Sequence, residues 1–139
     1  MMADCVFCKI MAKQIPATVV HEDEHTLAFM DIGQVNPGHV LVALKKHVEN
    51  IFALDEAQAA AVFGSAARVA RAIRGAFEPQ GLSVYQANGA AAGQTVFHLH
   101  IHLVPRYEGD GMALTWPVKN PPREKLEEAA AKIRASMPR

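Results

Sequence analysis

Three histidines alternate with aliphatic residues in one stretch of the chain, His98-Leu99-His100-Ile101-His102-Leu103-Val104-Pro105. In an extended strand, successive side chains point to opposite faces, so this spacing places the three imidazoles on one face and the aliphatic side chains on the other. Imidazole can transfer a proton, act as a nucleophile or bind a metal near neutral pH. The stretch therefore predicts an active site on one face of a strand and hydrophobic core on the other.

The middle histidine is a candidate nucleophile for phosphoryl or nucleotidyl transfer. His100 would have an imidazole about 7 Å away on either side, from a rise of roughly 3.3 Å per residue along the strand. A neutral ring nitrogen can attack phosphorus and form a phosphoramidate that water later cleaves. The sequence has no Walker loop, which argues against a P-loop kinase or a nucleotide-driven motor.

A small-residue loop precedes the histidines and is a candidate phosphate-binding element. It covers residues 89–95 and contains two glycines, Gly89 and Gly93. Glycine allows backbone N–H groups to come close to a phosphate, and Asn88 and Thr95 would add side-chain donors. The position of the loop, directly before the histidine stretch, favours this interpretation over simple flexibility.

A second candidate site contains the two cysteines of the chain, Cys5 and Cys8. In a reducing compartment, a C-x-x-C pair is more often half of a metal site or a redox dithiol than a structural disulfide. A thioredoxin-type dithiol would follow a strand and open a helix, and the sequence around the pair does not predict that context. As a zinc half-site the pair needs two more ligands, which the seven histidines could supply.

Length and charge limit the remaining classes of protein. A chain of 139 residues, half of them apolar, suits one domain over residues 1–139. Acidic and basic residues balance at 14 each, so no overall field attracts nucleic acid or an anionic membrane. The sequence has no segment apolar enough to span a bilayer and no signal peptide pattern, so we expect a cytoplasmic protein.

The hydrophobic pattern predicts an α+β fold with an antiparallel sheet. The main helix should begin after the N-cap Asp55, with Gln58 completing a capping box. Its predicted buried stripe is Phe63, Ala66, Ala70, Ile73 and Phe77. Strands are expected over 19–22, 26–31, 39–44, 82–88 and the histidine stretch.

Short helices are predicted at both ends of the chain. The N-terminal one has apolar residues from Phe7 to Ile15 and should end before Pro16. The C-terminal one occupies about 121–137, with a stripe made of Leu126, Ala130, Ile133 and Met137.

These motifs together resemble the histidine triad (HIT) family. The histidine stretch matches the family's central motif, and Asn36-Pro37-Gly38-His39 and Gly93-Gln94-Thr95-Val96 resemble its flanking segments. The resemblance extends from about Cys5 to Pro105. It implies a homodimer in which two five-stranded sheets join, and a hydrolase or transferase that works at the α-phosphate of a purine nucleotide without an organic cofactor. The leading expectation is a nucleoside phosphoramidase; a dinucleoside polyphosphate hydrolase and a nucleotide-binding regulatory module remain open.

The resemblance also implies a role for individual residues. His100 would be the nucleophile that becomes nucleotidylated, His98 and His102 would flank it, and His39 would help to organise the rings. Asp31 would accept hydrogen bonds from the ribose hydroxyls. The phosphate would be held by residues of the glycine loop, namely Asn88, Gly93, Gln94 and Thr95. The purine would lie against Phe7, Ile10, Phe29 and Ile32.

Some members of this family hold a structural zinc ion. The matching positions here are Cys5, Cys8, His47 and His98, and such a closed set of four ligands indicates structure rather than catalysis. If zinc is bound, the ring of His98 must turn away from the phosphate, and catalysis is left to His100 and His102. The long segment after Pro105, with Trp116, departs from the phosphoramidase branch of the family.

Overall fold

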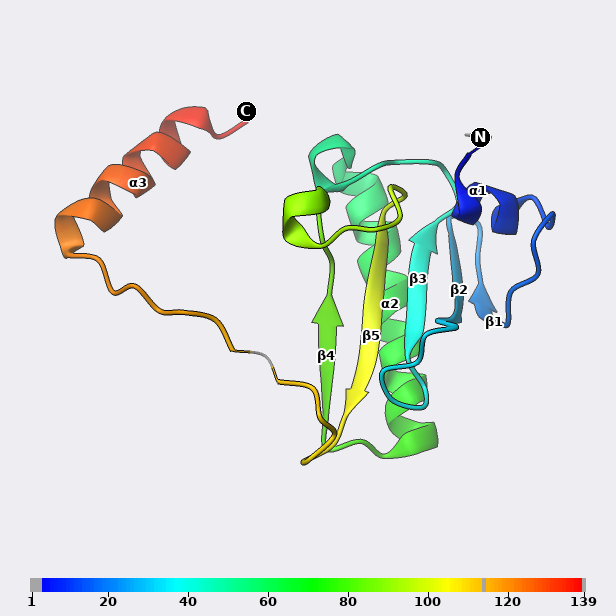
Figure 1. Ribbon diagram of the computed structural model, residues 1–139. Helices are drawn as coiled ribbons and strands as arrows, with labels where there is room; N and C mark the ends of the chain where they lie inside the picture. Colours follow the sequence, from blue (N-terminus) through cyan, green and yellow to red (C-terminus); the bar gives the residue numbers. More distant parts are fainter. Residues whose placement is uncertain (1–3, 114, 139) are drawn as a thin grey trace.

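A five-stranded antiparallel sheet forms the centre of the protein, as the sequence predicts (Figure 1). The structure, a computed structural model, describes residues 4–113 and 115–138. The strands lie in the order β1-β2-β3-β5-β4, with β1 Val19–Glu22, β2 Thr26–Met30, β3 Val40–Leu44, β4 Gly81–Tyr85 and β5 His100–Arg106. The helices are α1 Val6–Met11, α2 Glu56–Phe77 and α3 Arg123–Ser136, with short 3-10 helices at Ile51–Ala53 and Ala90–Ala92.

The two faces of the sheet are covered by different helices. The long helix α2 packs on one face, over a core that includes Val42, Ile101 and Leu103. The short helix α1 lies against the other face, where Phe7 packs with Phe29. Each face therefore has its own hydrophobic cluster, and β3 and β5 at the centre contribute to the layers on both sides.

The alternation predicted for the histidine stretch is confirmed from Ile101 to Leu103. These two aliphatic side chains are buried beneath α2, and the two histidines of β5 lie on the α1 face. The strand begins at His100, however, and not at His98. The N–H of Leu99 donates to the carbonyl of Val48 at 2.7 Å, outside the sheet, so the ladder of the strand does not extend to His98. The alternation itself does continue: Leu99 lies in the same cluster as Ile101 and Leu103, and the ring of His98 packs against Phe7 of α1, as that of His100 does.

The predicted capping box of α2 is present, because Asp55 and Gln58 exchange side-chain to backbone hydrogen bonds. The predicted buried stripe is only partly right: Phe63 and Phe77 remain 52% and 43% exposed. Ser65 faces the sheet instead, with its hydroxyl 2.7 Å from that of Thr26 on β2. Its Oγ also donates to Asp23 at 2.6 Å, so a buried polar network helps to set the rotation of the helix.

The C-terminal helix forms where the sequence predicts it but stands apart from the sheet (Figure 1). Every residue of α3 is exposed except Ala130, which is partly buried. The extended segment 115–122 that leads to it is exposed as well. None of the helices in the described part of the chain is long and apolar enough to cross a membrane.

Candidate active site and metal centre

A cavity of about 330 Å³ opens on the α1 face of the sheet, between α1 and the centre of β5. His100 and His102 line it, together with Asp31 at the end of β2. The structure also brings to this cavity the four residues predicted to enclose a purine, Phe7, Ile10, Phe29 and Ile32. The fold therefore assembles one hollow with an apolar wall, two imidazoles and a carboxylate.

The ring of His100 is held by the backbone two residues earlier. Its Nδ1 lies 2.7 Å from the carbonyl oxygen of His98. A carbonyl only accepts, so Nδ1 carries the proton and donates it in this bond. In the neutral ring, Nε2 is then left with a free lone pair. The edge of His100 also packs against Phe7, with ring centroids 4.9 Å apart, which further restricts its orientation.

The ring of His102 belongs to a chain of three hydrogen-bonded groups. The N–H of Val35 donates to Nδ1 of His39 at 3.2 Å, so His39 carries its proton on Nε2. That Nε2 lies 2.9 Å from Nδ1 of His102, which must therefore accept. The neutral His102 ring is left with its proton on Nε2. Two adjacent imidazoles of β5 thus differ: His100 keeps a lone pair on Nε2 and His102 keeps a proton there.

Burial keeps these imidazoles neutral. It lowers the pKa of His100, against smaller opposing effects of the hydrogen bond to the carbonyl of His98 and of the carboxylate of Asp31. It lowers the pKa of His102 to about 4, and His100 and His39 act in the same direction. The pKa of His39 is also lowered by burial, although the nearby carboxylate of Asp31 opposes the shift. Neutral imidazole is the form that can attack an electrophile, so the site is prepared for nucleophilic chemistry near pH 7.

The carboxylate of Asp31 lies beside both rings of this chain. Its Oδ2 is 3.4 Å from Nε2 of His39 and 3.8 Å from Nδ1 of His102. Its Oδ1 accepts the N–H of Gly33 at 2.8 Å, which fixes the side chain at the rim of the cavity. The three groups offer ligand atoms within 4.8 Å of one another and so could bracket a metal. Because the two rings are already at hydrogen-bond distance, we interpret the group as a relay of hydrogen bonds.

Of the four residues predicted to hold a phosphate, Thr95 lines the cavity. Asn88 is turned to another partner: its Oδ1 accepts the N–H of Ile51 at 2.7 Å, and its amide exchanges hydrogen bonds with that of Gln86. In this arrangement Asn88 ties the loop to the 3-10 helix that follows β3. Its predicted contact with phosphate would require these bonds to change.

Gln94 is buried and supports the glycine loop from inside. Its Oε1 accepts the N–H of Gly89 at 2.7 Å, and its Nε2 donates to the carbonyl of Glu49 at 2.8 Å. Gly93 adopts a positive φ of 91°, where a Cβ atom would lie 3.1 Å from the hydroxyl of Tyr85. These two residues therefore shape the loop, and neither is among those that line the cavity.

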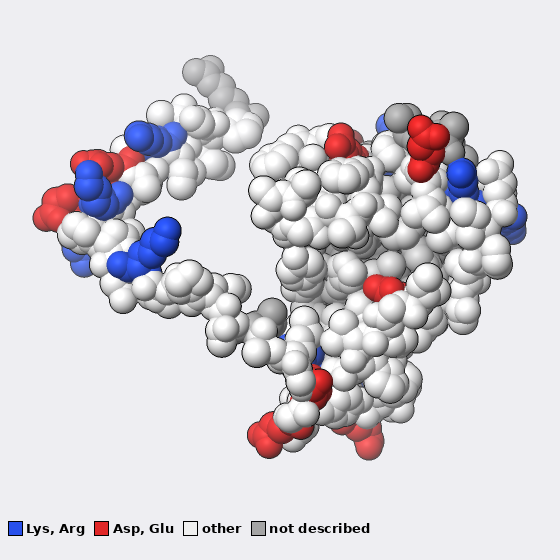
Figure 2. All heavy atoms as spheres, in the orientation of Figure 1, with Lys and Arg blue, Asp and Glu red and all other residues white. Residues whose placement is uncertain are grey.

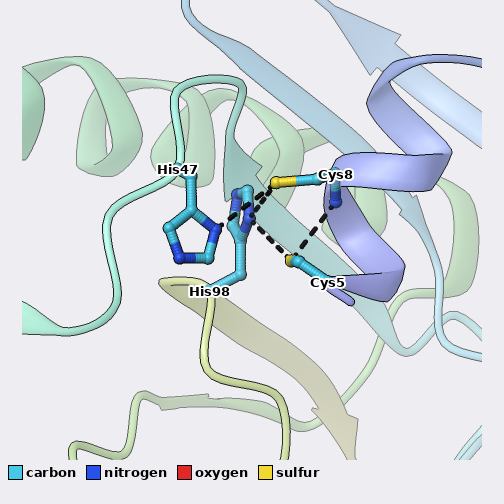
Figure 3. Close-up of side chains that lie close together, drawn as sticks. All are labelled: Cys5, Cys8, His47 and His98. Carbon is cyan, nitrogen blue, oxygen red and sulfur yellow. Dashed lines mark hydrogen bonds between the residues drawn. The ribbon is translucent and has the colours of Figure 1, made fainter. Parts of the chain in front are cut away.

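A second cluster brings together all four residues predicted to bind zinc (Figure 3). Cys5 and Cys8 come from the N-cap and first turn of α1, His47 from the loop after β3, and His98 from the turn before β5. Sγ of Cys5 is 3.3 Å from Nδ1 of His98. Sγ of Cys8 is 3.4 Å from Nδ1 of His47 and 3.6 Å from Nδ1 of His98.

These separations fit a tetrahedral metal site. With metal–ligand bonds of about 2.0–2.3 Å, the ligand atoms of a zinc tetrahedron lie roughly 3.3–3.8 Å from one another. Nε2 of His98 donates to the carbonyl of Leu44 at 2.6 Å, which leaves the lone pair of Nδ1 directed to the thiols. Burial lowers the pKa of His98, so its ring is neutral, as a metal ligand must be. The cluster can hold a metal, and its four protein ligands leave no open position for catalysis.

Sequence reasoning missed several parts of the cavity. Leu41 lines it from β3 and Tyr85 packs its ring against His102, with centroids 5.6 Å apart. The register between strands explains both, because Leu41 and Tyr85 are paired with His102 from either side. Without the strand order, nothing in the sequence indicated which residues flank the histidines.

Comparison with known proteins assigns the chain to a family. The model of the HIT domain matches residues 12–109. The protein named Protein hit of Bacillus subtilis is 50% identical over 114 residues, which cover 81% of this chain and 79% of that protein. A crystal structure of a HIT family member from Bacillus subtilis has a TM-score of 0.93 at 43% identity and covers 98% of this chain and 99% of its own. A HIT family protein from Bacillus anthracis has the same TM-score and identity and covers 99% and 100%.

Two further relatives have informative names. Adenosine 5'-monophosphoramidase hnt1 of Schizosaccharomyces pombe is 35% identical over 114 residues, which cover 81% of this chain and 83% of that enzyme. A zinc-bound histidine triad family protein from Mycobacterium smegmatis is 34% identical, with a TM-score of 0.75, and covers 96% of this chain and 98% of its own.

Proposed function

Because the chain belongs to the HIT domain family, we propose that it is a hydrolase acting at the α-phosphate of purine nucleoside phosphoramidates or related nucleotides. One observation carries this proposal. His100 lines an apolar cavity with its Nδ1 proton bound to the carbonyl of His98, so that Nε2 is free to attack. The named phosphoramidase relative supports the choice of a P–N bond as the bond that is cleaved.

In the first step, Nε2 of His100 attacks the α-phosphorus and the bond from phosphorus to the leaving group breaks. The nucleotide is now attached to His100, and the ring becomes cationic. The hydrogen bond from Nδ1 to the carbonyl of His98, 2.7 Å long, becomes charge-assisted and stabilises that cation. In the second step, water attacks phosphorus and gives a proton to the ring of His102, which is neutral after protonating the leaving group. The P–N bond to His100 breaks, and a nucleoside monophosphate is released.

His102 is the group placed to protonate the leaving group. Its ring centroid lies 5.1 Å from that of His100, and its remaining proton is on Nε2. The low pKa of His102, about 4, means that the ring is a strong acid once it is protonated. A phosphate that enters the cavity carries negative charge, which raises the pKa of a nearby imidazole. Substrate binding therefore favours the protonated form of His102 that catalysis requires.

The remaining cavity residues bind the nucleotide in this proposal. Asp31 accepts hydrogen bonds from the ribose hydroxyls, and Thr95 donates to a phosphate oxygen. Asn88, Gly93 and Gln94 complete the phosphate site after the glycine loop adjusts. The purine lies against the apolar wall described above, which selects the shape of the base more than its exocyclic groups.

We assign zinc to the cluster of Cys5, Cys8, His47 and His98. The donor set and the separations of 3.3–3.6 Å support the assignment, as does the zinc-bound relative. Zinc here would join α1 to the two loops next to the sheet, which is a structural role. Two cysteines that form no disulfide fit a reducing compartment, so we place the protein in the cytoplasm.

We also propose a homodimer that is joined at strand β4. This strand lies at the edge of the sheet, so its outer backbone groups have no partner strand among the described residues. An exposed edge strand readily pairs with a second chain. A second copy placed there would continue the sheet from one protomer into the other.

Trapping the covalent intermediate tests the proposed reaction. Wild-type protein is mixed with an adenosine phosphoramidate labelled at phosphorus, quenched within milliseconds, digested and mapped by mass spectrometry. We expect an acid-labile label on His100. A label on His102, or on a residue that is not a histidine, would refute the assignment of the nucleophile.

The choice of leaving group is tested with a matched pair of substrates. Turnover of an adenosine phosphoramidate is compared with turnover of a diadenosine polyphosphate under the same conditions. We expect a higher kcat/KM for the phosphoramidate. The opposite order would indicate a dinucleoside polyphosphate hydrolase, and binding without turnover of either would indicate a regulatory module.

A further inference from the structure

Beyond Asp110, the described residues form an arm that extends away from the sheet of the chain (Figure 1). This arm, residues 111–113 and 115–138, ends in α3, whose residues are all exposed apart from the partly buried Ala130. Within the described residues 115–138, the hydrogen bonds and ion pairs of the arm join residues of the arm itself, as between Lys125 and Glu128. Among the described residues of a single chain, α3 thus has nothing to pack against.

The exposed helix nevertheless carries an apolar stripe. Leu126, Ile133 and Met137 are 56%, 63% and 64% exposed, and with Ala130 they follow the 4-3-4 spacing of one helix face. An isolated helix of about this length is marginal in water, because its few hydrogen bonds barely offset the cost of nucleation. The stripe is therefore the surface through which α3 gains its stability, provided that something covers it.

The position of the arm is shared with separate solved structures. Residues 115–138 make up about a sixth of the chain. If they lay elsewhere in the structures from Bacillus subtilis and Bacillus anthracis, the TM-score could not reach 0.93 with 98–99% of this chain covered. Two crystallised proteins thus hold this arm in the same extended place, away from the sheet of its own chain. A reproducible position requires a contact, and that contact must come from another molecule.

The body of the protein offers an uncovered apolar surface on the side of the arm. Val84 of the edge strand β4 is 53% exposed, and Phe63 of α2 is 52% exposed. Phe63 lies on the flank of α2 opposite to Ser65, which contacts β2, so it faces the β4 side of the sheet. In the view of Figure 2, the body surface that faces the arm is formed by uncharged residues.

We propose that α3 binds a second copy of this chain, so that two protomers joined at β4 each hold the other with one arm. The second copy would occupy the space between β4 and α3 that a single chain leaves open. The reach is sufficient, because the twelve residues 111–122, with three prolines, extend to roughly 37 Å at about 3.1 Å per residue. A five-stranded sheet is only about 24 Å wide. This inference depends on the proposed homodimer and is independent of the proposed chemistry.

Charge placed on the apolar stripe tests the proposal. Leu126→Glu with Ile133→Glu puts two carboxylates where we expect the second copy to lie. The matched control, Ala131→Glu with Ala135→Glu, adds the same charge on the opposite face of α3. Sedimentation equilibrium should show the dimer Kd raised at least about tenfold by the first pair and less than about twofold by the control. A Kd that is unchanged by the stripe variant, or a wild-type chain that remains monomeric, would overturn the proposal.

A mixed-isotope experiment shows which copy the arm touches. A chain carrying a photoreactive phenylalanine analogue at position 133 is mixed with an excess of ¹⁵N-labelled wild-type chain, equilibrated and illuminated. We expect cross-linked peptides that join position 133 of the unlabelled chain to body residues of the ¹⁵N chain. Cross-links confined to unlabelled peptides would show that the arm folds back on its own chain and would contradict the proposal.

Discussion

His98 and His100 are two residues apart in one motif, yet their rings are used in opposite ways. The ring of His98 is fully buried and directs Nδ1 toward two thiols, because its Nε2 donates to the carbonyl of Leu44. The ring of His100 lines the cavity and leaves Nε2 free, because its Nδ1 donates to the carbonyl of His98. In each case a backbone carbonyl binds one ring nitrogen and so decides which nitrogen remains for chemistry.

The two clusters are also physically joined through His98. Its side chain belongs to the metal-binding cluster and its carbonyl orients the proposed nucleophile. Phe7 packs edge-on against both rings, 5.8 Å from His98 and 4.9 Å from His100. We therefore expect that a substitution in the metal-binding cluster affects mainly zinc binding and that a substitution in the cavity affects mainly catalysis. A smaller effect on the other property is expected in each case.

The largest effect is expected from paired alanine variants of these histidines. His100→Ala should lower kcat/KM for an adenosine phosphoramidate by about 10³-fold or more, because the nucleophile is lost. Its zinc content should remain that of the wild type. His98→Ala should lose zinc but keep kcat/KM within about tenfold, since the carbonyl at position 98 remains. Equal losses of activity in both variants would show that the two rings do not have separate roles.

Removal of one thiol should act on stability more than on chemistry. Cys8→Ser should reduce bound zinc to a small fraction and lower the Tm by about 10 °C or more, because a structural zinc contributes directly to folding. Calorimetry with and without a chelator provides the control. The chelator should lower the Tm of the wild type and leave that of Cys8→Ser unchanged. A wild-type Tm that does not respond to the chelator would contradict a structural metal.

Asp31→Asn tests whether the carboxylate acts on the ribose or on the imidazoles of the cavity. The amide keeps the size of the side chain and removes the charge beside His39 and His102. We expect KM to rise about tenfold, because a charged hydrogen-bond acceptor for the ribose is lost. A 2',3'-dideoxy substrate should show almost no difference between wild type and variant. If both substrates are affected equally, Asp31 acts on the imidazoles alone and does not contact the ribose.

The smallest effect is a displacement of the pH profile. Neutral imidazole is the active form of His100, and burial lowers its pKa below the ordinary value of about 6.5. As the pH falls through 6.5, kcat/KM should therefore show no loss, because His100 stays neutral, and the acid limb should begin only at lower pH. The measured pKa of the substrate phosphate serves as the control. An acid limb centred at or above 6.5 would show that the ring is solvated.

The sequence predicted the parts of this structure that depend on local pattern. The alternation of histidine and aliphatic residues placed Ile101 and Leu103 in the core, because side chains in a strand alternate whatever surrounds them. The capping box at Asp55 was predicted correctly because it also depends only on residues that are close together in the sequence. The antiparallel sheet followed from the spacing of the apolar runs, and its five strands were implied by the resemblance to the histidine triad family.

The errors arose where distant parts of the chain compete with local pattern. β5 begins at His100 and not at His98 because Leu99 bonds to Val48, 51 residues earlier. Phe63 is exposed because Ser65, a residue with little hydrophobic signal, finds hydrogen-bond partners on β2 and in the turn before it. The amphipathic pattern of α3 was visible in the sequence, but a pattern within one chain does not say which molecule covers it.

The metal-binding cluster closes two long loops in the chain. Cys8 meets His47 across 39 residues and His98 across 90 residues. The entropy lost on closing a loop grows only slowly with its length, so each of these two long closures costs only modestly more than a short loop would. Its ligands come together only after β3 and β5 have paired, and α1, with six residues, is too short to persist alone. Tight metal binding should therefore be among the last properties to appear as the chain folds and among the first to vanish as it unfolds.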